Sequence, residues 1–140
     1  MADQQQTAVA LRLSVGRLAR RLRQESPGDL TPSQRSALAT LDREGALRMS
    51  DLAAIERVSP PSMTGIVGRL EERGLVTREA NPNDARSTVV SITQRALDLL
   101  VAIRALRTAF LTTRLSTMTD DELLTLTRAI DLLNRITEDV

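Results

Sequence analysis

The chain has 140 residues, a formal net charge of +1, 19 basic residues that are all arginine, and no cysteine or histidine. These absences exclude disulfides, zinc fingers and catalysis by a thiolate or an imidazole. Phe110 is the single aromatic residue, which also excludes surfaces that bind single-stranded DNA or RNA by stacking its bases on aromatic side chains. Duplex DNA remains possible as a ligand.

The beginning of the chain, residues 1–6, lacks the basic start and apolar run of a secretory signal. No apolar stretch approaches the ~18 residues needed to span a bilayer. We therefore expect a cytoplasmic protein with no membrane partner.

Two helices are predicted in the first third of the chain. Apolar residues recur every three or four positions over residues 8–23, and the helix should stop at Ser26-Pro27-Gly28. A second helix is predicted over residues 32–44, because Thr31 and Gln34 have the spacing of a capping box and Pro32 suits a first helical position.

Two short helices joined by a tight turn are predicted next. Ser50 and Asp51 supply a cap and a first-turn acid. The apolar positions expected to face inward are Leu52, Ala53 and Ile55. The turn falls at residues 58–59, and the prolines at 60–61 are tolerated only in the first turn of a helix, which Gly74 then ends.

The rest of the chain predicts a hairpin followed by two long helices. Residues 75–80 and 88–92 are short β-type runs, and the turn formers at 81–87 between them predict an exposed tip. Thr93 caps a helix that continues to about Arg114, and Thr119-Asp120-Asp121-Glu122 is a capping box that opens the last helix.

This order of elements is that of a winged helix-turn-helix. We predict a mainly α (α+β) fold in which residues 31–92 form the DNA-binding lobe with a β-hairpin wing. Residues 7–25 and 93–140 are predicted to be dimerisation helices packed as one unit with it. Both outer helices carry apolar stripes, which favours a homodimer over the alternative of an intrachain helical layer. A twofold dimer predicts a pseudo-palindromic site with half-sites about 10 base pairs, or roughly 34 Å, apart.

The helix that begins at the tandem prolines is the predicted recognition helix. Its apolar residues fall in one sector, so the opposite face is small and polar. The predicted DNA contacts on that face are Pro61, Ser62, Thr64, Gly65, Gly68 and Arg69. Each interior glycine costs about 1 kcal/mol relative to alanine. Our hypothesis is that the glycines let the backbone approach base edges, while Ser62 and Thr64 form hydrogen bonds and Arg69 holds a phosphate. The alternative is ordinary surface glycines in a helix held by tertiary packing.

The wing supplies the other predicted contacts, Arg86 and Ser87. Asp84 lies two residues before Arg86, a spacing that lets its carboxylate brace the loop while the guanidinium projects. A projecting arginine suits the narrow, negative minor groove of A-tract DNA. The alternative is a solvated arginine paired with Asp84.

The run from Asp51 to Thr93 resembles the DNA-binding lobe of the MarR (multiple-antibiotic-resistance regulator) family. The residues that carry this resemblance are Leu52-Ala53, Val58-Ser59, Arg69-Leu70-Glu71, Gly74-Leu75-Val76, Arg78 and Asp84-x-Arg86-Ser87. The resemblance implies a dimeric transcription regulator, usually a repressor, whose DNA affinity often falls when a small molecule binds. Members often have arginine at the position of Gly65 and an acid at that of Gly68, so an operator sequence does not carry over.

Any effector is expected to be anionic or aromatic. Arg12 and Arg17 could receive an anion, and the alternative is a solvated basic face. No cofactor, metal site or catalytic residue is predicted.

Two other functions compete with DNA binding. A winged helix that serves only protein–protein interaction is disfavoured, because the outward face of the recognition helix lacks the apolar anchors such a surface needs. An enzyme is disfavoured because the chain has no nucleophile–base pair and no phosphate-binding loop.

Overall fold

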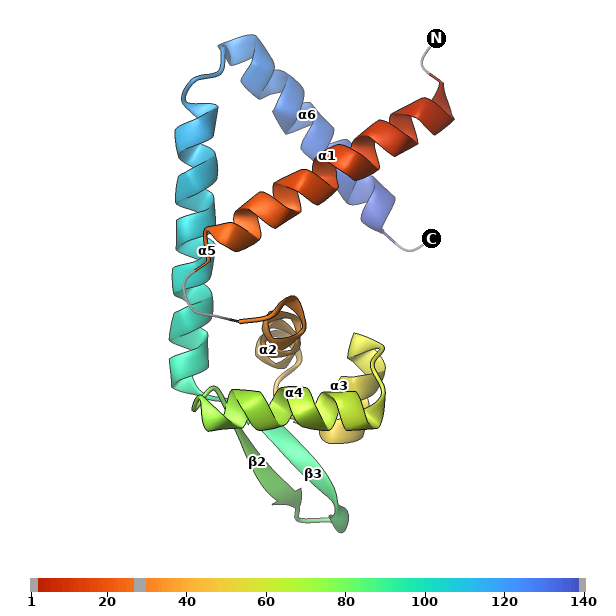
Figure 1. Cartoon of the computed structure of the whole chain (residues 1–140), viewed down its shortest axis with the longest axis vertical. Coiled ribbons are helices and arrows are strands. Elements are labelled where there is room, and N and C mark those ends of the chain that lie inside the picture. The colour runs from red at the N-terminus through yellow and green to blue at the C-terminus, as the bar shows by residue number, and fades with distance from the viewer. Residues whose placement is uncertain (1–2, 27–29, 139–140) are drawn as a thin grey trace. The chain divides into compact units, whose positions relative to one another are not determined.

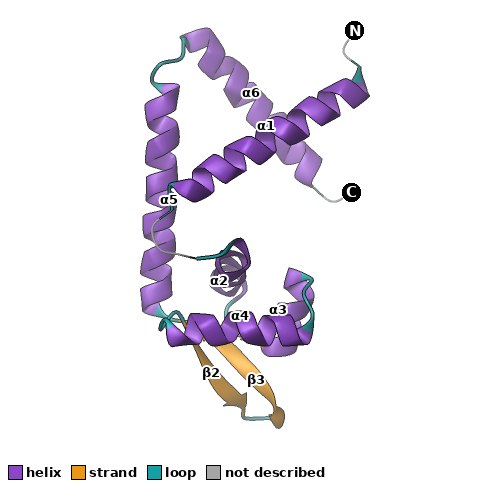
Figure 2. Ribbon diagram, viewed as in Figure 1, coloured by secondary structure: helices purple, strands orange, loops and turns teal. Residues whose placement is uncertain are grey.

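The computed structural model describes residues 3–26 and 30–138, and it is mainly helical with a small antiparallel sheet, which confirms the predicted fold class. Figure 1 shows the order of the elements, and Figure 2 distinguishes the strands of the hairpin from the helices by colour. The elements are α1 (Gln4–Gln24), α2 (Pro32–Glu44), β1 (Leu47–Arg48), α3 (Met49–Glu56), α4 (Pro60–Glu72), β2 (Val76–Asn81), β3 (Asp84–Ile92), α5 (Gln94–Leu115) and α6 (Asp120–Thr137).

The chain divides into two compact units, one formed by residues 27–104 and the other by residues 1–26 with 105–140. Helix α5 contributes its first part to one unit and the remainder to the other. The expected helix stop at Pro27-Gly28 lies outside the described residues, and α1 ends just before it, at Gln24.

The core of the unit 27–104 is formed by apolar side chains of α2, α3, α4, the sheet and the start of α5. Its fully buried large members are Leu38, Leu41, Leu52, Met63, Val67, Leu70, Leu75, Val76 and Val90. Burying such a side chain contributes about 1.5–3 kcal/mol, so this core fixes how α4 and the hairpin lie in the unit.

Helix boundaries follow local capping. Thr31 Oγ1 accepts from the Gln34 backbone N (3.1 Å), and the Thr31 N donates to Gln34 Oε1 (3.2 Å), so the predicted capping box at α2 is confirmed. At the other end of the lobe, Thr93 Oγ1 accepts from the Ala96 N (3.3 Å) and donates to the carbonyl of Gly74 (2.7 Å). Gly74 has φ +73°, the left-handed conformation predicted for the residue that ends α4.

Two predictions about α3 are wrong. The helix begins at Met49 with Arg48 as its N-cap, so Ser50 is not the cap, because β1 runs directly into the helix. Ile55 is 45 % exposed and does not face inward. Leu52 and Ala53 define the buried face, and Ile55 lies about 60° from Leu52 on the side away from Ala53 at 100° per residue.

The sheet has the strand order β1-β3-β2 and is antiparallel throughout. β1 has only two residues, opposite Val89 and Val90, and was not predicted. β3 begins at Asp84, so the predicted loop over 81–87 is too long. Ala80 pairs with Thr88 whereas Asn81 pairs with Asp84, so residues 85–87 form a bulge at the wing tip. The turn formers there interrupt the ladder without ending the strand.

The other unit leaves much apolar surface open within one chain. No described residue of α1 or α6 is buried, although the capping box of Thr119 and Glu122 at the start of α6 is confirmed. Its exposed large apolar side chains include Val9, Leu13, Val15, Leu18, Leu106, Leu124, Leu126, Ile130, Leu132 and Ile136. Among the described residues no helix combines the length and apolarity that crossing a membrane requires.

Candidate nucleic-acid interface

Helix α4 has one fully buried face and one open face. Its N-cap Ser59 accepts from the Ser62 N (3.3 Å), and Pro60 and Pro61 occupy the first turn. The buried residues are Met63, Val67 and Leu70, with Ile66 half-buried beside them, as the sequence predicts. The opposite face of α4 is therefore the one available to a partner (Figure 1).

The open face carries the predicted recognition residues. Pro61, Ser62, Thr64, Gly65 and Arg69 are exposed, and Gly68 is half-buried. Apart from the adjacent residues and the backbone of α4 itself, a Cβ at Gly65 or Gly68 would meet no atom of the described residues within 4 Å. Nothing in the packing of the described residues therefore requires glycine at either position, and the cost in helix propensity has no compensation among them.

The two hydroxyls on this face already have local partners. Ser59 Oγ donates to Ser62 Oγ (2.8 Å), and Thr64 Oγ1 donates to the carbonyl of Pro60 (3.0 Å). Ser62 keeps its own hydrogen for an outside acceptor, while Thr64 keeps only acceptor lone pairs. Thr64 is thus suited to a base amino group, and Ser62 to a base or phosphate acceptor.

The Arg69 side chain is exposed, and its guanidinium forms no ion pair or hydrogen bond with any described residue. It borders a surface depression of about 410 Å³ between α4 and the start of α2, which Ser62 and Gly65 also line. A free guanidinium beside an open backbone is chemically suited to a phosphate group.

The wing tip is braced by local hydrogen bonds. Asp84 Oδ1 accepts from the Arg86 backbone N (3.0 Å), and Ser87 Oγ donates to the Asp84 carbonyl (3.2 Å). The Arg86 guanidinium is exposed and forms no ion pair with Asp84 or another described residue. The side chains of Asp84 and Arg86 are therefore not paired with each other. The bulge presents an arginine that has no ion-pair partner among the described residues.

An ion pair that sequence reasoning missed joins the recognition helix to the wing. Arg78 of β2 donates to Glu71 Oε1 of α4 through Nη2 (2.9 Å) and Nε (3.2 Å). This hydrogen bond holds the pKa of the Glu71 carboxyl below its usual range and raises the pKa of Arg78. Both residues belong to the motifs quoted for the family resemblance, but seven positions of separation gave no reason to pair them.

Metal chemistry has no visible support in the part of the chain that the structure describes. No three acidic residues there come together in a group that could hold a metal ion. The site offers hydroxyls, glycine backbone and free arginines, which suit binding to a polyanion.

Comparisons with known proteins agree with this geometry. The sequence model of the family described as "MarR family" matches residues 30–88. An HTH-type transcriptional regulator of Mycobacterium leprae is 44 % identical over 124 residues, which cover 88 % of this chain and 87 % of the relative. The HTH-type transcriptional repressor MdtR of Bacillus subtilis is 33 % identical over 95 residues, which cover 68 % of this chain and 61 % of MdtR.

A solved structure extends the likeness to nearly every residue. A transcriptional regulator protein from Pseudomonas aeruginosa is 32 % identical, with a TM-score of 0.87 over 99 % of this chain and 100 % of that chain. The flanking helices are thus shared as well as the central lobe.

Proposed function

Since this chain belongs to the MarR family of HTH-type, DNA-binding transcriptional regulators, we propose that it acts as a homodimeric repressor on a pseudo-palindromic operator. The observation that carries the proposal is the wing tip, where Asp84 braces the backbone and leaves the Arg86 guanidinium free. A repressor must reach chromosomal DNA, which places its action in the cytoplasm.

In this proposal α4 lies in the major groove and the wing follows the adjacent minor groove. Gly65 and Gly68 allow close approach of the α4 backbone, because no side chain stands on that part of its open face. Ser62 and Thr64 contact base edges, Arg69 binds a phosphate, and Arg86 enters the minor groove next to Ser87. Phosphate contacts position the protein, and the few polar groups on α4 supply sequence discrimination.

The dimer is proposed to form through the outer helices, within residues 7–25 and 93–140. Their apolar side chains are exposed in one chain, with Ile130 at 54 % and Ile136 at 67 %. So many exposed large apolar side chains on a few helices are unusual on a soluble monomer and typical of a subunit interface. Pairing two chains about a twofold axis sets two recognition helices about 34 Å apart, one helical turn of DNA.

Repression and its release are the finer parts of the proposal. The relative MdtR is named a repressor, which supports that direction of control. A small anionic or aromatic effector is supported by the environment of Phe110, because the guanidiniums of Arg21 and Arg114 lie 4.8 and 4.9 Å from the centroid of its ring. Arg107, on the same helix as Phe110, donates a hydrogen bond to the hydroxyl of Ser26 and has no carboxylate partner among the described residues. Its pKa is lowered by burial and, to a lesser extent, by the charge of Arg23.

The proposal is tested by titrating the protein against DNA from the region upstream of its own gene and against random duplex, each at two salt concentrations. The affinity for the upstream DNA should exceed that for random duplex at both salt concentrations. Both affinities should fall steeply as salt rises, because protein binding releases cations from the DNA. Equal affinity for the two duplexes at both salts contradicts a sequence-specific repressor.

A further inference from the structure

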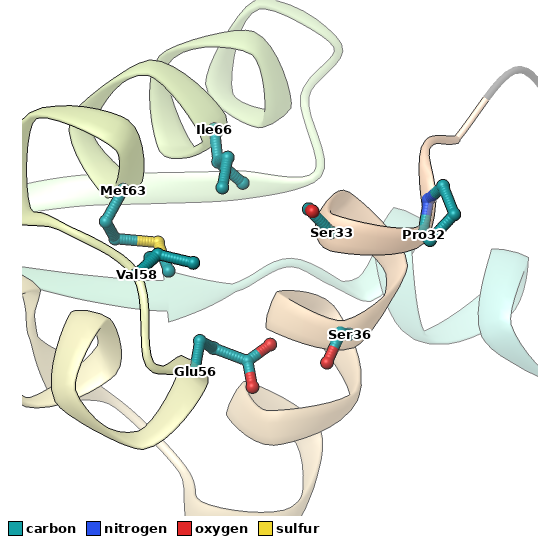
Figure 3. Close-up of a pocket in the computed structure, with 7 residues that line it drawn as sticks. All are labelled: Pro32, Ser33, Ser36, Glu56, Val58, Met63 and Ile66. Carbon is teal, nitrogen blue, oxygen red and sulfur yellow. The ribbon is translucent and has the colours of Figure 1, made fainter.

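A small pocket lies behind the recognition helix, between α2 and the turn that joins α3 to α4. It has a volume of about 230 Å³ and is lined by Pro32, Ser33, Ser36, Glu56, Val58, Met63 and Ile66. Figure 3 shows the Glu56 carboxylate directed toward Ser36, with Val58, Met63 and Ile66 on the side of α4. The pocket thus has an oxygen-lined side and an apolar side.

The oxygen-lined side carries one negative charge. Glu56 is the only charged residue of the lining, and its carboxylate forms no ion pair within the described ranges. One of its oxygens accepts from Thr40 Oγ1 (3.3 Å), a buried hydroxyl of α2. The Ser33 and Ser36 hydroxyls have no hydrogen-bond partner among residues 3–26 and 30–138, so their lone pairs are free to accept.

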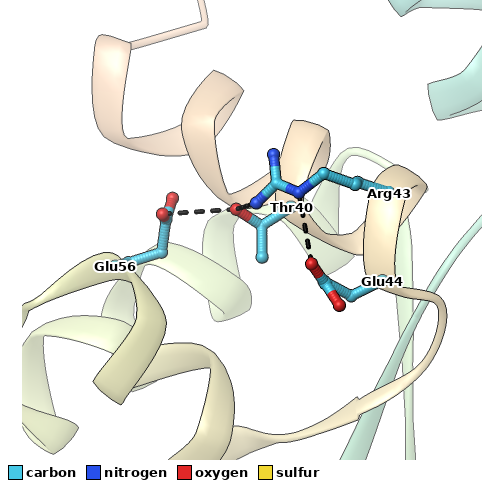
Figure 4. Close-up of polar contacts among 4 residues, drawn as sticks. All are labelled: Thr40, Arg43, Glu44 and Glu56. Atoms are coloured by element: carbon cyan, nitrogen blue, oxygen red, sulfur yellow. Dashed lines mark hydrogen bonds and ion pairs between the residues drawn. The ribbon is translucent and has the colours of Figure 1, made fainter. Parts of the chain in front are cut away.

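Two arginines, one that shares a hydrogen-bond partner with Glu56 and one that follows it in the chain, form no ion pair with it. Arg43 reaches the same Thr40 hydroxyl (3.5 Å), but its Nε is paired with Glu44 (3.2 Å), as Figure 4 shows. Arg57 follows Glu56 in the chain, is exposed, and makes no ion pair with a described residue. The carboxylate therefore lacks a direct cationic partner among the described residues, and it lines a partly apolar pocket.

We propose that this pocket binds a small organic cation, a primary ammonium group attached to a short apolar body. The N–H donors of an ammonium match the Glu56 carboxylate and the neighbouring Ser36 hydroxyl, and Ser33 adds a further hydroxyl to the lining. The apolar body packs against Val58, Met63 and Ile66. The volume lies below the ~300–1,000 Å³ of pockets for drug-sized ligands, which limits the ligand to a small amine.

A ligand at this place touches the back of α4. Met63 and Ile66 line the pocket, while Ser62, Thr64 and Gly65 occupy the opposite, open face. A ligand that binds one position of α4 more tightly shifts the helix toward that position, and the factor by which the ligand changes DNA affinity equals the factor by which DNA changes ligand affinity. This coupling rests on the proposed DNA-binding mode, whereas occupancy of the pocket does not.

The test uses the full chain without DNA, with benzylammonium as the probe and two-dimensional amide NMR as the measurement. Benzylammonium should shift the amides of Ser33, Ser36, Val58 and Ile66, while the anion benzoate should leave these amides unshifted and neutral benzyl alcohol should bind more weakly. Glu56→Gln should weaken benzylammonium about tenfold, since a charge-assisted hydrogen bond is lost. The matched control Glu72→Gln changes an exposed α4 glutamate with no partner among the described residues and should leave affinity unchanged.

Equal shifts of the pocket amides by benzoate overturn the proposal without any variant. Undiminished affinity in a folded Glu56→Gln protein, or shifts confined to other residues, overturn it as well. Repeating the benzylammonium titration with DNA present then separates binding in the pocket from its coupling to DNA affinity. Occupancy without a change in DNA affinity removes the coupling and leaves the site, and absence of DNA binding contradicts the proposed function alone.

Discussion

The carboxylate of Asp84 accepts a hydrogen bond from the backbone N–H of Arg86 (3.0 Å), and it forms no ion pair with the guanidinium of that residue. The contact orders the bulge at the wing tip, where residues 85–87 have no partner in the strand ladder. Asp84 thus shapes the backbone that presents Arg86, and the positive charge stays available to an outside anion.

This arrangement predicts different effects for two substitutions of Asp84. Asp84→Asn keeps an acceptor oxygen, so DNA affinity should be retained or slightly raised by the loss of a negative charge. Asp84→Ala also removes the charge but leaves the Arg86 N–H without its acceptor, and DNA affinity should fall several-fold. Fluorescence anisotropy with operator DNA measures both. Equal affinities for the two variants would remove the bracing role.

Gly65 predicts a separation of stability from DNA binding. Outside its own helix, a Cβ there meets no atom of the described residues within 4 Å, so Gly65→Ala should raise the free energy of unfolding by up to about 1 kcal/mol through helix propensity. Gly65→Leu should fold and lose specific DNA binding, because its side chain occupies the space needed by a base edge. Gly16→Ala in α1, where a Cβ is equally free of contacts within one chain, is the matched control for the gain in helix propensity. Specific binding by a folded Gly65→Leu protein contradicts the close-approach hypothesis.

The Glu71–Arg78 ion pair predicts a dependence of stability on pH. The pKa of Glu71 is lower in the folded chain than in an unfolded one, chiefly because Arg78 donates a hydrogen bond to its charged form. Its contribution is therefore fully present above the unfolded pKa and is lost as pH falls through the folded pKa. Thermal melts of wild type and Glu71→Gln should differ at neutral pH and converge in acid. Glu79→Gln changes an exposed β2 glutamate with no ion pair among the described residues, and it should show no such convergence.

The exposed apolar face of α6 predicts dependence of DNA binding on assembly. Ile130 is 54 % exposed in one chain, and Ile130→Glu should dissociate the proposed dimer because it buries a charge against apolar side chains. Sedimentation velocity should show a monomer, and operator affinity should fall strongly because only one half-site is engaged at a time. Arg128→Glu, an exposed α6 position, is the control. A wild-type protein that sediments as a monomer at the concentrations that bind DNA contradicts the dimer.

Local chemistry explains what the sequence could predict. Capping involves residues three apart, so Thr31 with Gln34 and Thr119 with Glu122 located two helix starts correctly. The Asp84–Arg86 contact spans two residues and was predictable for the same reason. The apolar spacing of Met63, Val67 and Leu70 identified the buried face of α4.

Features that depend on elements meeting in space were missed or wrong. β1 is too short to show a periodicity, and its pairing with β3 displaced the start of α3 from Ser50. To predict the Glu71–Arg78 pair, one must know the direction in which β2 leaves α4. The pocket at Glu56 requires the packing of α2 against the α3–α4 turn. None of these relationships is encoded in the spacing of neighbouring residues.

Hydroxyl-radical footprinting of operator DNA by wild type and Arg86→Ala tests the central claim most directly. The wild type should protect two half-sites about 10 base pairs apart, each with an outer minor-groove segment contacted by a wing. Arg86→Ala should still protect the two half-sites at raised protein concentration, but it should lose the protection of the minor-groove segments. It should bind DNA roughly ten- to a hundredfold more weakly, with the dimer intact. An unchanged footprint and affinity in Arg86→Ala, or a single protected segment with wild type, would contradict the account.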